Sequence, residues 1–207
     1  LYGTTVINEP FSVELVNQYL GQSNVTQISL VPTMLSKLVN HKPSHLNTVR
    51  SILVGGGSLR RELYRQSRAL GLSVLPSWGL TEAGSQVATQ TFDATSEGLD
   101  VGYPMPFVKV GVTDEHLSLD GPLVNAPVVT SDRGRIDSEG RVFVHGRSDD
   151  VINTGGIKVT PERIEEIYGG IDRARCVTAV AMPDNEWGQQ ISIAIEVDLN
   201  ELDPCLE

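Results

Sequence analysis

A short stretch in the N-terminal half alternates between strand-like, turn-like and helical patterns, and this order restricts the fold more than any other feature. Ile52 to Val54 is a short apolar run that predicts a buried strand, and it ends at three glycines, Gly55 to Gly57. Leu59 to Leu70 places apolar residues at helical spacing, and Gly71 can end that helix before Val74 opens the next strand. This order predicts a largely parallel sheet covered by helices.

The residues before this stretch repeat the same alternation. Ser12 can cap a helix over Val13 to Leu20, and Gly21 is expected to end it. Val25 to Val31 is rich in β-forming residues, and the proline that follows it suits the first turn of a second helix. Residues 1–97 are therefore predicted to form an α/β unit.

The pattern changes in residues 98–148, where short alternating runs such as Val108 to Val112 and Val142 to Val144 are separated by prolines, glycines and acidic turns. This texture predicts an antiparallel or barrel-like β region. We expect residues 1–148 to be the C-terminal part of one large domain, made of the α/β unit and this β region.

A second change follows Arg147. Thr160 can cap a short helix that begins at Pro161, with Ile164, Ile167, Tyr168 and Ile171 on one face, and strands are expected at 177–181 and 191–197. We place a domain boundary near Asp149, so that residues 149–207 are the start of a small α+β domain.

Composition excludes several classes of function. The formal net charge of -10 and the pI near 4.8 oppose binding to nucleic acids or anionic lipid surfaces, and the basic residues form no compensating run. Cys176 and Cys205 are far apart and suggest neither a disulfide framework nor a zinc site, which fits a reducing cytoplasm. No apolar run approaches the length of a membrane span.

Thr81 and Glu82 follow a turn rich in glycine and tryptophan, where a carboxylate can bind Mg²⁺ and a hydroxyl can contact a phosphate oxygen. Taken alone, such a dipeptide at a strand end is more often a solvated cap. Gly55 to Gly57 would allow close backbone approach to a ligand, although three glycines also form ordinary tight turns. The sequence contains no phosphate loop of the Gly-x-x-x-x-Gly-Lys type.

Further candidate residues lie in the β region and beyond it. Asp132 has paired acceptors for the vicinal hydroxyls of a ribose, or it is an ordinary turn aspartate. Arg147 offers a donor fork to a sugar or phosphate, or it pairs with Asp149 or Asp150. Lys158 could meet a phosphate or a thiol cofactor, or it is simply exposed.

Aromatic and histidine chemistry adds little by itself. Trp78 is either a core aromatic or a stacking surface for a base. The four histidines (His41, His45, His116 and His145) lack metal-ligand spacing and a nucleophile partner, so neither metal-centred nor Ser-His chemistry is expected.

The order and spacing of these motifs closely resemble the adenylate-forming superfamily of AMP-binding enzymes, which includes acyl-CoA synthetases, peptide-synthetase adenylation domains and luciferases. Three segments carry most of the resemblance. The family's aromatic-Gly-x-Thr-Glu motif is similar to Trp78-Gly79-Leu80-Thr81-Glu82, and its adenine-side glycine loop is similar to Gly55-Gly56-Gly57. The family's hinge and the opening of its small domain are similar to the segment from Gly146-Arg147-Ser148-Asp149-Asp150 through Pro161-Glu162-Arg163-Ile164-Glu165. The last is the most specific.

The resemblance implies a role for each matching residue. Thr81 would contact the α-phosphate of ATP, Glu82 would bind Mg²⁺, and Trp78 would stack on adenine beside Gly79. Asp132 and Arg147 would hold the ribose. The small domain would rotate about Asp149 after adenylation, so that Gly156 and Lys158 serve the thioester-forming step with coenzyme A.

Within the superfamily, the sequence is most similar to 2-succinylbenzoate-CoA ligases of menaquinone synthesis, through Thr81 to Gln86, Val101 to Pro106 and Asp132-Arg133-Gly134. This resemblance implies an ATP-dependent acid-thiol ligase with a small carboxylic acid as substrate, and it would place Ser85 near the acyl group.

The sequence also departs from the family pattern. Thr130-Ser131-Asp132 replaces the usual Thr-Gly-Asp, and the segment between Gly121 and Thr130 is short. The family's phosphate loop is expected before Leu1 and its catalytic lysine beyond Glu207, so these 207 residues alone are expected to be incomplete for activity. An adenylation domain that loads a carrier protein and a non-catalytic, nucleotide-binding remnant stay open as alternatives, as does a homodimeric state.

Overall fold

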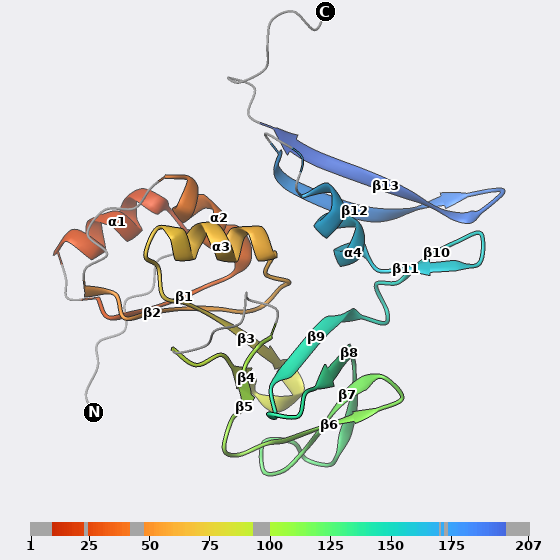
Figure 1. Ribbon diagram of the computed structural model, residues 1–207, viewed down its shortest axis with the longest axis horizontal. Helices are drawn as coiled ribbons and strands as arrows, with labels where there is room; N and C mark the ends of the chain where they lie inside the picture. Colours follow the sequence, from red (N-terminus) through yellow and green to blue (C-terminus); the bar gives the residue numbers. More distant parts are fainter. Residues whose placement is uncertain are drawn as a thin grey trace, which may run out of the picture.

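The computed structural model describes residues 10–22, 25–41, 48–92, 100–169, 171 and 174–197. Within these ranges the chain forms three β-sheets and four α-helices (Figure 1). Among the described helices, none combines the length and the apolar character needed to cross a bilayer.

The first sheet has the strand order β1-β2-β3-β4-β5. The strands β1 (Gln27–Leu30), β2 (Ser51–Val54) and β3 (Val74–Leu80) run parallel, as the alternating pattern predicts. Two antiparallel strands, β4 (Ser85–Thr89) and β5 (Tyr103–Pro104), extend the sheet beyond β3.

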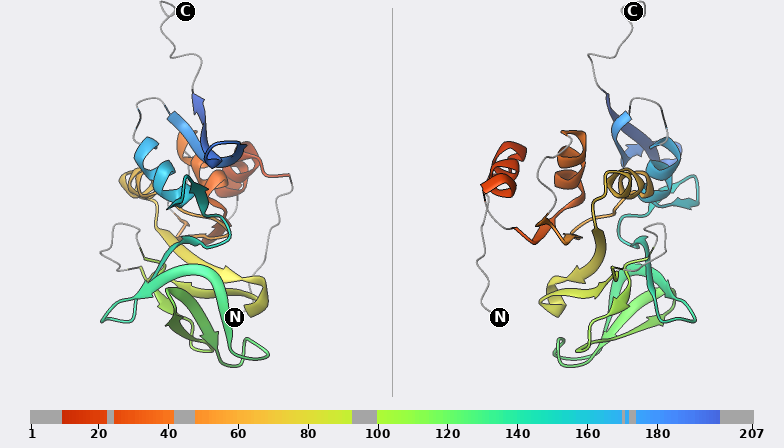
Figure 2. Two further views of the ribbon diagram at one scale, coloured as in Figure 1. Left: turned by 90° about the vertical axis from the view of Figure 1, so that its right-hand side faces the viewer. Right: turned by 60° about the vertical axis from the view of Figure 1, so that its left-hand side comes forward.

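The three N-terminal helices pack on one face of β1–β3, as Figures 1 and 2 show. They are α1 (Val13–Gln22), α2 (Pro32–Asn40) and α3 (Arg61–Ala69). The core between helices and sheet is formed by apolar side chains, including Leu30, Leu35, Leu38, Ile52, Val54, Leu63, Tyr64 and Val74. Burial of these side chains supplies the driving force for this layer.

Two helix ends differ from the sequence-based expectation. Ser12 does act at the start of α1, where its Oγ accepts a hydrogen bond from the Leu15 N–H at 3.3 Å. The helix does not end at Gly21, however, but continues to Gln22, because one glycine costs a helix only about 1 kcal/mol. Leu70, which was expected to lie within α3, caps the C-terminal end of this helix and is exposed. Ser67 belongs to the buried face of α3.

The second sheet is an antiparallel meander in the order β6-β7-β8-β9. Its strands are β6 (Lys109–Thr113), β7 (His116–Asp120), β8 (Val128–Ile136) and β9 (Val142–Arg147). Its core includes Leu117, Leu119 and Val142 and also takes in Trp78 and Val87 from the first sheet, so the two sheets share one apolar cluster. The expected β region thus packs directly against the end of the α/β unit.

The third sheet has the order β11-β10-β13-β12, and its strands are β10 (Ile152–Thr154), β11 (Ile157–Val159), β12 (Ala174–Asp184) and β13 (Gly188–Val197). The helix α4 (Pro161–Tyr168) packs on this sheet through Ile164. The domain boundary near Asp149 stays a prediction; Asp149 lies between the last strand of the second sheet and the first strand of the third.

The helix predicted to begin at Pro161 is present as α4, but its apolar face is only partly buried. Only Ile164 is buried, whereas Ile167, Tyr168 and Ile171 are exposed, and Ile171 lies beyond the helix. The helix is short and contacts its sheet along a single narrow stripe. Thr160 does occupy the N-cap position, but its side chain makes no capping hydrogen bond.

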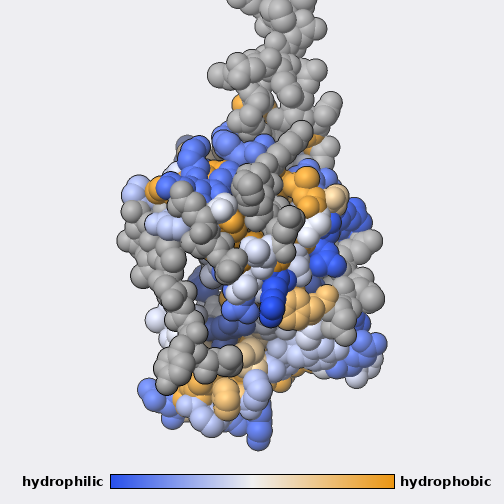
Figure 3. Space-filling model, turned by 90° about the vertical axis from the view of Figure 1, so that its left-hand side faces the viewer, coloured by the Kyte–Doolittle hydropathy of each residue, from blue (hydrophilic) through white to orange (hydrophobic). Residues whose placement is uncertain are grey.

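Figure 3 views the side of the molecule that carries α1 and shows polar and apolar residues interspersed on that face. Scattered single apolar residues are normal for a protein surface and indicate no function.

Candidate functional site

The carboxyl ends of β2 and β3 bring the glycine loop beside the tryptophan motif. The Ser77 hydroxyl donates a hydrogen bond to the Val54 carbonyl at 3.2 Å, which ties the two strand ends together. A Cβ added to Gly55 would lie 2.6 Å from Ser77 Oγ, so the close approach of the strands depends on glycine there. In open α/β sheets, ligands bind beyond the carboxyl ends of parallel strands. Gly55, Gly56 and Gly57 therefore lie where a nucleotide is expected.

The indole N–H of Trp78 donates a hydrogen bond of 2.8 Å to Oδ2 of Asp132. The two residues belong to different sheets, and both are almost completely buried, with 7% of Trp78 and 8% of Asp132 exposed. Of the two interpretations of Trp78, the core aromatic describes where the side chain lies. Adenine stacking stays a prediction for the exposed remainder of the ring.

Asp132 is fixed on its strand by backbone and side-chain contacts. Its N–H donates to the Thr130 hydroxyl at 3.1 Å, and that hydroxyl donates to the Leu117 carbonyl at 2.9 Å. Asp132 pairs with Arg147 in the register of β8 and β9, so the predicted ribose-binding carboxylate and guanidinium lie side by side on one sheet. Ser131, which replaces the usual glycine, accepts a hydrogen bond from the Ser148 N–H through its carbonyl at 2.8 Å.

Arg147 directs its guanidinium mainly toward the predicted hinge residue. Its Nε and Nη2 bind the two carboxylate oxygens of Asp149 at 2.9 and 2.5 Å. The distance from Nη1 to Oδ1 of Asp132 is 3.9 Å, which is an ion pair but not a hydrogen bond. The hydrogen bonds and charge of Asp149 raise the pKa of Arg147, and the guanidinium holds the pKa of Asp149 below its ordinary value. Arg147 thus forms the salt bridge with Asp149 and also lies within ion-pair distance of Asp132.

Thr81 and Glu82 form a 3-10 turn with Ala83, directly after β3. The turn closes with a hydrogen bond from the Gly84 N–H to the Thr81 carbonyl at 3.0 Å, and Gly84 has a left-handed φ of 75°. Gly79 permits the turn, because a Cβ there would lie 1.9 Å from the backbone carbonyl of Ser85. Ser85 opens β4 opposite Leu80 and is exposed.

Within the described part of the chain, the side chains of Thr81 and Glu82 are exposed and make no hydrogen bond or ion pair. No described cluster of three acidic, histidine or cysteine residues forms a ready metal site. A single free carboxylate still fits Mg²⁺, because this ion usually binds through one or two carboxylates together with substrate phosphates.

Gly156 and Lys158 lie apart from the Thr81–Glu82 turn, on the β10–β11 hairpin of the third sheet (Figures 1 and 2). Gly155 and Gly156 have left-handed φ values of 57° and 84° and form the hairpin turn. Lys158 is exposed opposite Asn153. The structure therefore assembles the Trp78–Asp132–Arg147–Asp149 group but does not bring Lys158 to it.

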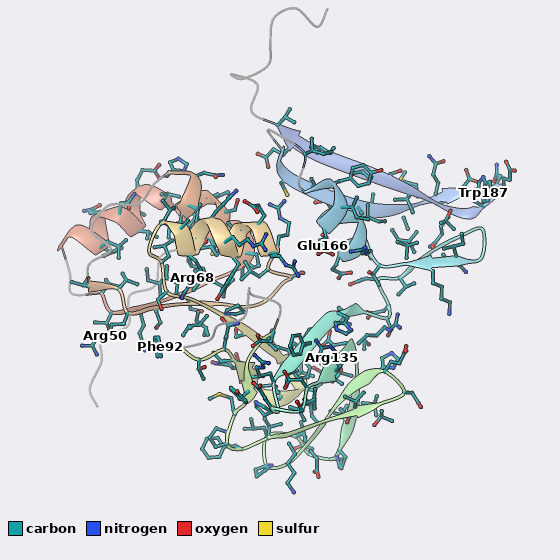
Figure 4. The ribbon with its side chains drawn as sticks, in the orientation of Figure 1. Arg50, Arg68, Phe92, Arg135, Glu166 and Trp187 are labelled. Atoms are coloured by element: carbon teal, nitrogen blue, oxygen red, sulfur yellow. The ribbon has the colours of Figure 1, made fainter. Side chains whose placement is uncertain are left out.

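Two residues in the part of the chain after Asp149 were missed by the sequence reasoning. Trp187 lies at the tip of the β12–β13 hairpin (Figure 4), and a Cβ on Gly155 would lie 2.4 Å from its ring. A hollow of about 400 Å³ lies beside it, lined by Thr154, Asp184, Glu186, Trp187 and Gln190. The sequence signal that could have identified this feature is the Asp-x-x-Trp-Gly turn, which ends at Gly188.

Glu162 is the second missed residue. Its carboxyl group packs on Gly146, and its Oε2 is buried without a hydrogen-bond partner. Burial, and next the charges of Glu165 and Asp150, raise the pKa of Glu162. Glu165 has a different role, since its Oε1 accepts a hydrogen bond from the Ala179 N–H at 3.0 Å and ties α4 to β12. Glu162 lies within the recognised hinge motif, but its burial depends on how the hinge folds.

The chain resembles several characterised proteins. It is 27% identical over 208 residues to a 2-succinylbenzoate-CoA ligase of Lactococcus lactis, covering 91% of this chain and 46% of that protein. It superposes on o-succinylbenzoate-CoA synthetase of Bacillus subtilis in complex with the acyl-adenylate intermediate, with a TM-score of 0.77 and 25% identity over 91% of this chain and 44% of that one. The same B. subtilis enzyme with ATP and magnesium gives a TM-score of 0.75 at 25% identity, over 90% and 45% of the two chains.

The chain therefore spans less than half the length of these relatives. The family model of AMP-binding enzymes matches residues 2–127, which is more than half of the chain. That region contains the glycine loop and the Trp78–Glu82 motif, and the protein belongs to the AMP-binding enzyme family.

Proposed function

We propose that the whole protein is an ATP-dependent acid-thiol ligase, which converts a carboxylic acid to an acyl-adenylate and then to a coenzyme A thioester. The observation that carries this proposal is the continuous set of contacts from Trp78 through Asp132 and Arg147 to Asp149. It joins the predicted nucleotide motif on β3 to the predicted hinge at the end of β9. A ligand that contacts Asp132 would thus lie beside the segment that sets the position of the third sheet.

The adenylation site would lie at the carboxyl ends of β2 and β3. Gly55, Gly56 and Gly57 would approach the adenine, and Asp132 with Arg147 would bind the ribose hydroxyls. Thr81 would donate its hydroxyl to the α-phosphate. Glu82 would hold Mg²⁺, which neutralises the charge that develops as pyrophosphate leaves.

The carboxylate of the acid substrate would attack the α-phosphorus and displace pyrophosphate, and Ser85 would lie near its acyl group. The thiol of coenzyme A would then attack the acyl carbon, with AMP as the leaving group. We assign Asp149 as the hinge for the rotation between these steps, and Gly156 and Lys158 to the face used in the second step.

2-Succinylbenzoate is the acid we propose, because both the curated relative and the superposed B. subtilis structures are ligases for this substrate. This substrate would place the protein in menaquinone synthesis and, together with the cysteine usage, in the cytoplasm. A carrier-protein acceptor in place of coenzyme A and a nucleotide-binding remnant without catalysis are the competing functions.

The first experiment uses the protein at its natural length and measures ATP–pyrophosphate exchange with 2-succinylbenzoate and a panel of other carboxylic acids. We expect exchange that depends on both Mg²⁺ and the acid, strongest with 2-succinylbenzoate. Absence of exchange with every acid would support the remnant. Addition of coenzyme A should then give the thioester; adenylate without thioester would favour a carrier-protein acceptor.

Glu82→Gln tests the site within the same assay. The substitution removes the negative charge but keeps the side-chain shape, and Glu82 is exposed without partners in the described region. We expect loss of Mg²⁺-dependent exchange with an unchanged melting temperature. Retained exchange would contradict the role of Glu82, while Glu186→Gln, another exposed carboxyl for which the described residues provide no side-chain partner, serves as the matched control.

A further inference from the structure

The hydrogen bond between Trp78 and Asp132 joins the first sheet to the second. Trp78 lies on β3 and Asp132 on β8, and the 2.8 Å bond connects the single polar atom of the indole to Oδ2 of the carboxylate. Both groups are nearly excluded from water. A hydrogen bond to a charged group in such surroundings is stronger than one in water.

This bond also restricts the orientation of the carboxylate. Oδ2 is held by the indole, whereas Oδ1 has no hydrogen bond among the described residues and is 3.9 Å from Nη1 of Arg147. Rotation about the terminal torsion of an aspartate is otherwise soft. With Oδ2 fixed, Oδ1 is the atom left free to accept a hydrogen bond from a ligand beside Arg147.

We infer that Trp78 is a positioning residue for the ribose: its indole N–H fixes the Asp132 carboxylate so that Oδ1 is presented to the vicinal hydroxyls. This inference rests on the proposed function, and it assigns Trp78 a task that is distinct from stacking on adenine. A ring face that stacks can be supplied by phenylalanine as well as tryptophan. Phenylalanine has no N–H group, so it cannot supply the hydrogen bond that the indole of Trp78 donates to Asp132.

The test compares the binding of AMP and 2′-deoxyAMP to the natural-length protein by calorimetry, with Trp78→Phe as the main variant. The wild type should prefer AMP, because Asp132 accepts a hydrogen bond from the 2′-hydroxyl. Trp78→Phe should weaken AMP binding about tenfold, as expected for a hydrogen bond to a charged group. Its affinity for 2′-deoxyAMP should change little, so its preference for AMP should largely disappear.

Two further variants separate positioning from a merely structural role. Val142→Ala removes a fully buried side chain from the same core cluster without touching Asp132, so it should lower the melting temperature and keep the preference for AMP. Asp132→Asn should abolish the preference, and adding Trp78→Phe to it should cause no further loss, because both act through one contact. If Trp78→Phe folds poorly, Trp78→Tyr is tested in its place, because tyrosine also has no donor at the position of the indole nitrogen.

The outcomes distinguish this inference from the proposed function. A wild type that discriminates between the two nucleotides, together with a Trp78→Phe variant that discriminates equally well, would overturn the positioning role and leave the proposed function intact. A wild type that binds neither nucleotide would overturn both. If Trp78→Phe lost affinity for AMP and 2′-deoxyAMP by the same factor, the positioning role would be overturned. Trp78 would then act in binding the adenine or in stabilising the fold.

Discussion

The carboxyl group of Glu162, at the start of α4, lies directly against Gly146, near the end of β9. A Cβ built on Gly146 would come within 2.7 to 2.9 Å of all three carboxyl atoms of Glu162, and Gly146 has a φ of 109°. The contact joins the helix that follows the predicted hinge to the strand that precedes it. It therefore reports on the position of the third sheet relative to the second.

Gly146→Ala should destabilise this contact. The substitution places a side chain at a strongly positive φ and forces the flexible Glu162 carboxyl to move, so we expect a loss of about 1 to 3 kcal/mol in the free energy of unfolding. Gly140→Ala is the matched control, since its φ of 84° is also positive but nothing lies within 4 Å of the added Cβ. Chemical denaturation of both variants measures the difference. A larger loss for Gly146→Ala would support the Glu162 contact, and equal losses would show that the Glu162 carboxyl adds nothing to the cost of the positive φ.

Glu162 should make stability depend on pH. Because burial first, and then Glu165 and Asp150, raise its pKa above the ordinary 4.5, the unfolded chain releases this proton at lower pH than the folded chain does. The unfolded state binds fewer protons in that window, so stability falls as pH rises from about 4.5 through the raised pKa. Glu162→Gln should remove this part of the slope and stabilise the protein above it.

The measurement for Glu162→Gln is a series of denaturation midpoints from pH 4 to pH 8. Glu166→Gln, on the exposed face of the same helix, is the control and should leave the slope unchanged. A Glu162→Gln variant with the wild-type slope would mean that the carboxyl is solvated.

Gly79→Ala should disrupt the turn that carries Thr81 and Glu82. The added Cβ would meet the backbone carbonyl of Ser85 at 1.9 Å, and backbone cannot move aside as a flexible side chain can. We expect a loss of several kcal/mol in stability, or failure to fold, by analogy with severe overpacking. Gly57→Ala is the control, because its Cβ would make only ordinary contacts of 3.6 Å with Pro32. Thermal denaturation of each variant measures this loss. A wild-type melting temperature for Gly79→Ala would contradict the close contact between Gly79 and the Ser85 backbone.

Asp149→Pro should separate the two half-reactions of the proposed ligase. Proline fixes φ at the predicted hinge and removes the carboxylate that Arg147 binds. We expect thioester formation to fall at least tenfold more than pyrophosphate exchange, whereas Asp149→Asn, which keeps the backbone free, should affect both only mildly. Rapid-quench assays of each step provide the comparison. Equal loss in both steps would argue against alternation about Asp149.

The α/β layer was the most predictable part of the fold. The β-rich run at β1, the apolar runs at β2 and at the start of β3, and the helical patterns between them predicted parallel strands with covering helices, and both are present. Local patterns succeed best at β2, the middle strand of the three, because a parallel strand covered on its faces reads as a nearly continuous apolar run. They were off by one residue at the end of α1, which continues past Gly21 to Gln22, and the apolar spacing at Ile167 did not correspond to a buried side chain.

Sequence order alone determined that this chain carries the motifs of an AMP-binding enzyme, because glycines, a Thr-Glu turn and a hinge motif are local and keep their spacing. Only the tertiary structure decided that the N–H of Trp78 is bound to Asp132, that Arg147 holds Asp149 more closely than Asp132, and that Oε2 of Glu162 is buried with its carboxyl group against Gly146. The Trp78–Asp132 bond joins two sheets, and the contact of Glu162 with Gly146 spans the predicted hinge. Their geometry depends on how the sheets pack, and no spacing along the chain encodes it.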